Sequence, residues 1–186
     1  MTTIHCSTAP ETRDRIESLI KRIDDPRHRR MLEVWLKHWW GEVIYDLTMV
    51  METVTEDIVY RWHGTDQIGD GVDASSADFA RNMYQTQFDA ELMPGGPFDQ
   101  EHFAFGEGGL TLEGIFVAVF PGAMLKGRSA QPDPEQLYLV QFPMVVTTPF
   151  DCDRWLMKGE IMYAGAPLNI EPTDAAAVRR LRGFGD

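Results

Sequence analysis

The sequence contains little cysteine, little positive charge and no long hydrophobic run. Its 186 residues include only two cysteines, Cys6 and Cys152, which are too few for a disulfide framework. Lys and Arg total 17 against 29 Asp and Glu, so the formal net charge is −12. Nucleic acids and anionic membrane surfaces attract basic proteins, so this balance disfavours both as partners. The longest strongly apolar stretch, residues 115–120, is far too short to span a bilayer.

The sequence also lacks a secretion signal and the motifs that indicate a cofactor. It has no HExxH and no closely spaced His/Cys cluster, so we predict no metal. The glycines of GGPF and GEGG are not followed by Lys-Ser/Thr, and Ser75-Ser76 sits in no nucleophile elbow. We therefore predict no organic cofactor and no serine hydrolase. The first ten residues have neither a basic start nor an apolar stretch, so we expect a cytoplasmic protein.

Apolar spacing predicts helices first and strands afterwards. Helices are expected over residues 10–24, 28–45, 46–55 and 73–88, and strands over 55–64, 101–105, 110–120, 136–147 and 154–164. This order indicates an α+β fold with an antiparallel sheet. The length suits a single domain over 1–186, with a core at about 28–165, an additional N-terminal helix at 10–24 and a short C-terminal tail at 172–186.

The second helix carries the residues of greatest chemical interest. At 100° per residue, its tryptophans and leucines form a broad apolar face, and His38 and Glu42 lie one turn apart beside that face. Such a pair can hydrogen-bond, which fixes the imidazole tautomer and raises its pKa. The pair also fits a half-buried contact with no catalytic task, and it supplies too few ligands for a metal site.

Residues 38–63, HWWGEVIYDLTMVMETVTEDIVYRWH, resemble the first pocket-forming unit of the SnoaL-like, ketosteroid-isomerase-like (nuclear transport factor 2-like) superfamily. Tyr45-Asp46 matches the turn after the long helix, and Glu56-Asp57 matches the acidic pair before the strand. ADFARNMYQTQF resembles the following helix, and FDCDRWLMKGEIMYAG resembles the last hairpin. The resemblance covers about residues 31–165. It implies a cone-shaped, strongly bent antiparallel sheet wrapped around three to four N-terminal helices, a pocket between them, and homodimers or homotrimers.

The resemblance also implies roles for individual residues. His38 occupies the place of the steroid isomerases' oxyanion-binding tyrosine, Tyr84 matches a second tyrosine, and Val54 replaces a third. Trp62 falls where those enzymes keep their general-base aspartate, and the strand QFPMVVTT lacks their protonated aspartic acid. Steroid isomerisation by that mechanism is therefore rejected.

The candidate site combines these positions with residues on nearby strands. Strand alternation puts Tyr60 and Trp62 on one face, and a large aromatic residue at the base position suits a flat apolar ligand. His63 fits either the pocket mouth or a surface turn, and the register of His102 is open, although family dehydratases and cyclases often place a histidine on a central strand. The predicted catalytic residues are His38, Glu42, Tyr84 and His102, and the predicted substrate-binding residues are Tyr60, Trp62, Tyr45 and His63.

Two functions remain open. The first is a cofactor-independent lyase or isomerase, of dehydratase, cyclase or carbon–carbon lyase type. It would use His-centred acid–base chemistry on a small apolar, hydroxylated molecule, aromatic or polycyclic, with His38 as the proton-transfer residue. The second is a non-catalytic protein that binds or senses a small apolar molecule in the same pocket. The tryptophan at the base position favours binding, and the His/Glu/Tyr cluster favours catalysis.

Overall fold

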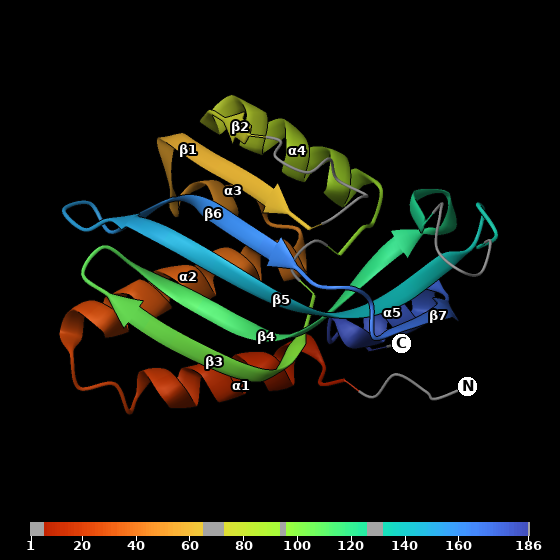
Figure 1. Ribbon diagram of the computed structural model, residues 1–186, viewed down its shortest axis with the longest axis horizontal. Coiled ribbons are helices and arrows are strands. Elements are labelled where there is room, and N and C mark those ends of the chain that lie inside the picture. The colour runs from red at the N-terminus through yellow and green to blue at the C-terminus, as the bar shows by residue number, and fades with distance from the viewer. Residues whose placement is uncertain (1–5, 65–72, 94–95, 126–131, 186) are drawn as a thin grey trace.

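A computed structural model describes residues 6–64, 73–93, 96–125 and 132–185. Five α-helices, a 3-10 turn and seven strands follow one another along this part of the chain (Figure 1). They are α1 (Ala9–Ile20), α2 (Pro26–Ile44), α3 (Leu47–Met51), β1 (Val54–His63), β2 (Asp73–Ser75), α4 (Ala77–Asp89), β3 (Phe98–Gly106), β4 (Gly109–Pro121), η1 (Gly122–Leu125), β5 (Leu137–Asp151), β6 (Leu156–Ala164), β7 (Asn169–Thr173) and α5 (Ala175–Leu181).

The strands form one open sheet in the order β2-β1-β6-β5-β4-β3, with β7 paired to β5. All pairs are antiparallel except β1 and β6, which run parallel. The prediction of a purely antiparallel sheet was therefore wrong in this one respect. Alternation along a strand indicates which face is buried, but it does not say which strands become neighbours.

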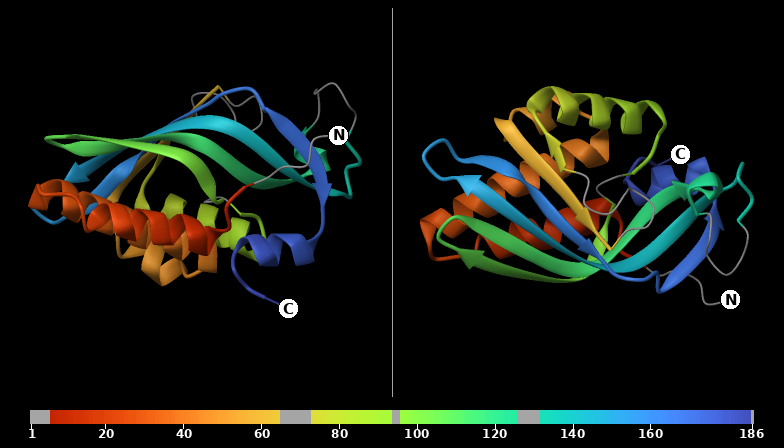
Figure 2. Two further views of the ribbon diagram at one scale, coloured as in Figure 1. Left: turned by 90° about the horizontal axis from the view of Figure 1, so that it is seen from below. Right: turned by 45° about the horizontal axis from the view of Figure 1, so that its top comes forward.

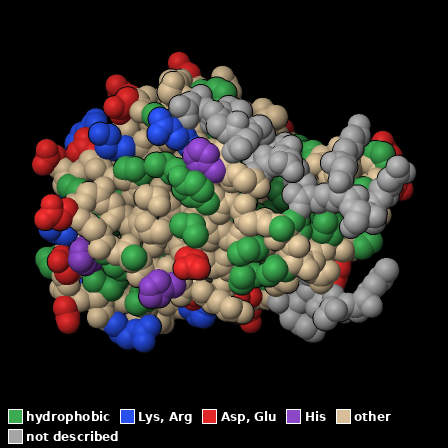
Figure 3. Space-filling view, viewed as in Figure 1, with side chains coloured by type: hydrophobic (Ala, Val, Ile, Leu, Met, Phe, Trp, Pro, Cys, Tyr) green, Lys and Arg blue, Asp and Glu red, His purple; other side chains and the backbone are tan. Residues whose placement is uncertain are grey.

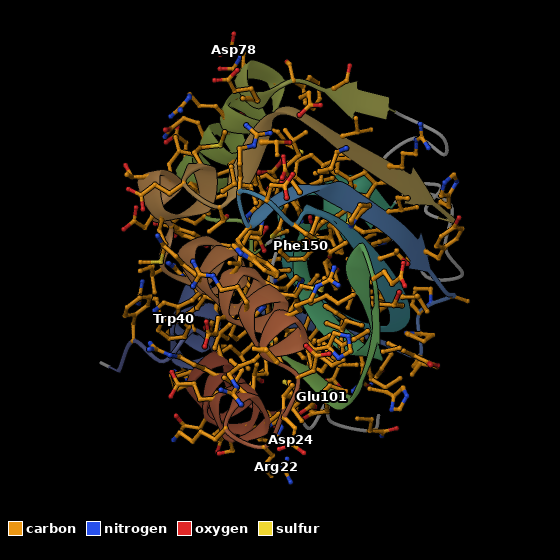
Figure 4. The ribbon with its side chains drawn as sticks, turned by 90° about the vertical axis from the view of Figure 1, so that its left-hand side faces the viewer. Arg22, Asp24, Trp40, Asp78, Glu101 and Phe150 are labelled. Carbon is orange, nitrogen blue, oxygen red and sulfur yellow. The ribbon has the colours of Figure 1, made fainter. Side chains whose placement is uncertain are left out.

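The helices lie on the concave side of the bent sheet, as predicted. Figure 2 shows the sheet arching over α1, α2, α3 and α4, with β7 turning down towards α5 at one end. The fold is thus α+β, with a bent sheet around the N-terminal helices. Phe150 lies in the interior between α2 and the sheet, whereas Arg22, Asp24 and Asp78 lie at the periphery (Figure 4).

Local sequence signals account for the helix boundaries. Thr8 and Glu11 form a capping box at the start of α1, and Asp25 caps α2 ahead of Pro26. Tyr45 ends α2 in the left-handed region at φ 60°, and Asp46 caps α3 as predicted. None of the helices in the described ranges is long and apolar enough to cross a bilayer.

Two short strands were not predicted. Residues 73–75 pair with β1 as β2, so the helix expected from 73 begins only at Ala77, after the cap Ser76. Most of the loop predicted over 64–73 lies outside the described residues. The expected tail after 172 instead follows β7, which pairs with β5, and contains α5. Arg182 fastens this end, because its Nε donates to the carbonyl of Val43 at 2.6 Å.

The convex face of the sheet is turned towards the viewer in Figure 3. It presents hydrophobic, histidine and charged side chains side by side. Because α2 lies on the concave side of the sheet, the site residues predicted on α2 lie on that side as well.

Candidate active site

A cavity of about 410 Å³ lies between α2, α4 and the concave face of the sheet. Four residues of α2 line it, Trp35, His38, Trp39 and Glu42, at the spacing of one helical stripe. Cavities of 300–1,000 Å³ are typical of small-molecule sites. The rest of the wall is mainly apolar: Trp62, Met83, Leu92, Met93, Phe116, Val117, Ala118, Val119, Phe120, Met124, Val140, Phe142, Met144, Val146 and Met162.

His38 is held on its Nδ1 side by Thr53. The two atoms Nδ1 and Oγ1 are 2.7 Å apart, and the Thr53 hydroxyl donates its own proton to the Val50 carbonyl at 2.6 Å. A hydroxyl has one proton, so Thr53 must accept from His38. The Nδ1 of His38 therefore carries a proton, and its Nε2 faces the cavity cluster.

Tyr84 is the centre of that cluster. Its hydroxyl donates to Glu42 Oε1 at 2.6 Å and lies 3.0 Å from the Tyr60 hydroxyl and 3.1 Å from His38 Nε2. A phenol has a single proton, and the shortest contact takes it, so Tyr60 donates to Tyr84. The remaining lone pair suits a proton on His38 Nε2, which is also 3.4 Å from Glu42 Oε1.

The electrostatics agree with this proton assignment. Burial lowers the pKa of His38, but its hydrogen bond to Glu42 and the charge of that carboxylate outweigh burial, so the pKa is raised. Burial raises the pKa values of Tyr60 and Tyr84 well above 10. The site therefore favours the protonated form of His38 and keeps both phenols protonated.

Glu160 completes the cluster and was not predicted from the sequence. It lies on β6 opposite Tyr60 of β1, so the two side chains share the cavity face. Burial and the charge of Glu42 raise the pKa of Glu160 to about 7, while the charge of His38 and the indole N–H of Trp35 oppose the rise. This carboxyl therefore exchanges its proton near neutral pH.

A glycine beside Glu160 allows β6 to lie close to β1 at this position. Gly159 has φ 145°, and a Cβ there would sit 1.8 Å from the carbonyl oxygen of Val59. Only glycine lets β6 approach β1 this closely. Met162 and Ala164 follow Glu160 at intervals of two and line the same cavity, but only the strand pairing shows that this face of β6 is the concave one.

His38, Glu42 and Glu160 each offer one atom within 4.8 Å of the others, a spacing that could hold a metal ion. The hydrogen bonds argue for protons there instead, because a metal needs a deprotonated imidazole nitrogen and His38 has a partner for a proton on each nitrogen. The absence of a metal remains a prediction for elemental analysis.

Comparison with known proteins identifies the fold. No family model matches the sequence, and no curated protein matches it significantly. Solved structures do match. A candidate SnoaL-like polyketide cyclase from Shewanella putrefaciens CN-32 aligns with a TM-score of 0.60 at 10% identity, covering 88% of this chain and 91% of that one. The chain has the SnoaL-like fold.

Two further structures agree. A candidate SnoaL-like polyketide cyclase from Shewanella denitrificans OS-217 gives a TM-score of 0.55 at 14% identity, covering 72% of this chain and 88% of the other. The epoxide hydrolase/cyclase-like enzyme SalBIII, of pyran ring formation in the polyether salinomycin, gives 0.53 at 12% identity and covers 78% and 98%. The predicted resemblance is thus confirmed at the level of the fold.

Within the SnoaL-like fold, five of the eight predicted site residues meet at the cavity: His38, Glu42, Tyr84, Tyr60 and Trp62. Tyr60 and Trp62 share a face, as strand alternation predicted, with ring centroids 5.8 Å apart. Tyr60 supplies the second phenol hydroxyl of the cluster. Val54, which the resemblance put in the place of a third tyrosine, does not line the cavity.

The other three predicted residues lie outside the cavity. His102 is exposed on β3, because its neighbour Phe103 turns inward against Trp35. His63 follows Trp62, so it points to the opposite face and stacks on Tyr163, with ring centroids 4.7 Å apart.

Tyr45 is also misplaced by the prediction. Its left-handed backbone at the end of α2 turns its ring away from the cavity. The ring stacks on Phe88 with 4.9 Å between the two centroids, and the guanidinium carbon of Arg182 lies 3.3 Å from the centroid of the Tyr45 ring. Tyr45 therefore packs the C-terminal segment against α2.

Proposed function

We propose that this protein is a cofactor-independent lyase or isomerase, of cyclase or dehydratase type, that acts on a small apolar, hydroxylated molecule. One observation carries the proposal. A buried group of ionisable residues, His38, Glu42, Tyr84, Tyr60 and Glu160, lines a cavity whose other walls are mainly apolar. The fold is shared with candidate polyketide cyclases and an epoxide hydrolase/cyclase-like enzyme, which supports this reaction class.

The geometry favours Glu160 as the residue that exchanges a proton with substrate. The sequence indicated His38 for that role, but both nitrogens of His38 have partners inside the protein. Glu160 lines the cavity, and its pKa of about 7 suits a general acid–base at neutral pH. Glu42 then raises the proton affinity of Glu160, and His38 lowers it.

Glu160 alone can accept and return the proton that each proposed reaction moves. In an isomerisation, ionised Glu160 removes a proton from a carbon beside a carbonyl and returns it at another carbon. In a dehydration, it removes the carbon-bound proton, and the acid so formed protonates the departing hydroxyl, which leaves as water. Each cycle ends with Glu160 ionised again, so neither reaction consumes an oxidant or a cofactor.

A non-catalytic binding protein is the second candidate. Trp62 forms a flat apolar wall at the position where related isomerases keep a base, and His38 and Glu42 have hydrogen-bond partners inside the protein. Both features suit a site that only holds an apolar molecule.

Hydrogen–deuterium exchange of an enolisable apolar ketone, 2-tetralone, separates the two candidates. In heavy water, the wild-type protein should accelerate exchange at the carbon between the carbonyl and the ring, as followed by NMR. Glu160→Gln should lower that rate by roughly 100- to 10,000-fold, the usual contribution of a general base. The rate should rise through pH 7 in the wild type and not in Glu160→Gln.

Glu113→Gln is the matched control, because Glu113 is an exposed glutamate on β4 of the same sheet. A Glu160→Gln rate equal to that of Glu113→Gln would remove Glu160 from the mechanism. A wild-type protein that binds 2-tetralone, aromatic diols and hydroxylated polyketides tightly without accelerating exchange or turnover would establish the binding protein instead. Once turnover is found, a His38→Gln variant at the wild-type rate would confine His38 to a structural role.

A further inference from the structure

The indole N–H of Trp35 is a buried donor without an acceptor. Trp35 is only 3% exposed, and its Nε1 has no hydrogen-bond partner among the described residues. Leaving such a donor unpaired costs about 1–3 kcal/mol. Trp35 lines the cavity from α2, one turn before His38, so a molecule in the cavity is positioned to accept from it.

The Glu160 carboxyl lines the same cavity from β6. The Trp35 N–H acts on this carboxyl as a donor that lowers its pKa, although the two groups do not reach the distance and angle of a hydrogen bond. A donor and a group that both accepts and donates therefore face the same part of the cavity. Tyr84, Glu42 and His38 do not compete for this place, because their hydrogen bonds are directed at one another.

We infer that Trp35 and Glu160 form a subsite for one uncharged hydroxyl group, so that the ligand is a neutral alcohol or phenol with an apolar body. The hydroxyl oxygen accepts from Trp35 Nε1, and its proton is donated to Glu160. A hydrocarbon leaves the Trp35 donor unpaired, and an ether satisfies Trp35 but cannot donate to Glu160. The inference rests on the proposed function, since the hydroxyl is held at the residue assigned to proton transfer.

The charge of the cavity excludes anionic ligands. None of the described residues that line it is Lys or Arg, and the one histidine among them, His38, is paired with Glu42. A carboxylate or phosphate would be buried beside Glu42 and Glu160 without a free counter-charge, which is strongly unfavourable. The subsite therefore selects against charged metabolites as well as for a hydroxyl.

The chain offers a matched control for Trp35. Trp39 lines the same cavity one turn further along α2, and its ring is nearly parallel to that of Trp35, with centroids 6.3 Å apart. Its Nε1, however, donates to the carbonyl of Gly96 at 3.4 Å. Replacing either tryptophan by phenylalanine removes one N–H from the same wall, but only Trp35 has that N–H free for a ligand.

The test measures dissociation constants by equilibrium dialysis for four probes with one apolar body: naphthalene, 2-naphthol, 2-methoxynaphthalene and 2-naphthoate. In the wild type, 2-naphthol should bind roughly tenfold more tightly than naphthalene, the fold-change of one buried hydrogen bond. 2-Methoxynaphthalene should lie between them, and 2-naphthoate should bind most weakly. Trp35→Phe should lower the naphthol-to-naphthalene ratio and bring 2-methoxynaphthalene level with naphthalene, because only the bond to Glu160 remains, and Trp39→Phe should leave the ratio unchanged.

Equal binding of 2-naphthol and naphthalene, tightest binding of 2-naphthoate, no binding of any probe, or a ratio that survives Trp35→Phe would each overturn the inference. If Trp35→Phe does not fold, the order of the four probes on the wild type decides. The outcome is distinguishable from that of the exchange assay. Loss of the hydroxyl preference with intact exchange overturns the subsite alone, and intact preference without exchange overturns only the catalytic proposal.

Discussion

Replacing Tyr84 by phenylalanine removes the one hydroxyl that joins the cluster while keeping the ring that packs in the core. Three contacts are lost: the donation to Glu42 at 2.6 Å, and the acceptance from Tyr60 at 3.0 Å and from His38 at 3.1 Å. Tyr84 is 2% exposed, so water from outside the cavity does not replace the hydroxyl.

The expected cost follows from the groups left behind. A hydrogen bond to a charged group contributes about 1.5–3 kcal/mol and a neutral one about 0.5–1.5 kcal/mol. Glu42 and His38 can still move towards each other across their 3.4 Å separation, which offsets part of the loss. We therefore expect the free energy of unfolding to fall by about 3 kcal/mol. For a chain of this length, that corresponds to roughly 6–12 °C in the melting temperature.

Urea unfolding at neutral pH, followed by circular dichroism, measures this difference. Tyr138→Phe is the control, because the Tyr138 hydroxyl also accepts a hydrogen bond, from the backbone N–H of Asp133 at 3.0 Å, but near the surface. The control should change stability by less than about 1 kcal/mol. A Tyr84→Phe variant as stable as Tyr138→Phe would refute the hydrogen-bonded cluster at the base of the cavity.

The pH dependence of stability should reveal Glu160. Its folded-state pKa of about 7 lies above the ordinary 4.5, so its contribution is fully present below about pH 4.5 and is lost as the pH rises through 7. At about 1.4 kcal/mol per pKa unit, the loss is on the order of 3 kcal/mol, and Glu160→Gln should abolish it in urea titrations at pH 5 and 8. The pKa of His38 is also raised, so His38 adds a loss of stability with rising pH that Glu160→Gln retains. A Glu160→Gln variant with the wild-type pH profile of stability would contradict the pKa assigned to Glu160. Trp62→Ala should weaken naphthalene and 2-naphthol equally, by roughly tenfold in dialysis, because it removes apolar wall and no donor; an effect on only one probe would argue against this. Elemental analysis should find no stoichiometric zinc or iron; stoichiometric metal that His38→Ala removes would show that the cluster holds an ion.

The part of the site on α2 could be predicted because it depends on local geometry. The positions of His38 and Glu42 follow from the helical repeat, and the repeat holds once Asp25 and Pro26 start the helix. The same reasoning placed Tyr60 and Trp62 together on β1, since a strand alternates with a fixed period of two. In both cases the relevant information lies within a few residues of the side chain.

Glu160 and His102 show where local reasoning stops. Both are polar residues on strands, and the sequence does not say which face of each strand is concave. The answer depends on which strands pair: the parallel contact of β6 with β1 puts Glu160 opposite Tyr60. His102 lies opposite Glu113 on β4 and faces outward. Parallel pairing between strands nearly 100 residues apart is a long-range choice that no short pattern encodes.

The cost of Glu160 is itself an argument for a function in this cavity. A buried carboxyl whose pKa is raised by burial and by Glu42 destabilises the folded chain as the pH rises through that pKa, and a glutamine of the same shape would avoid this penalty. Gly159 adds a second constraint, because its backbone geometry tolerates no side chain next to that carboxyl. Groups that reduce stability and meet in one pocket are characteristic of active and binding sites, where proton affinity is tuned at the expense of stability. A protein that only enclosed an apolar ligand would gain nothing from a carboxyl that titrates at pH 7, so the location of this cost favours catalysis over simple binding.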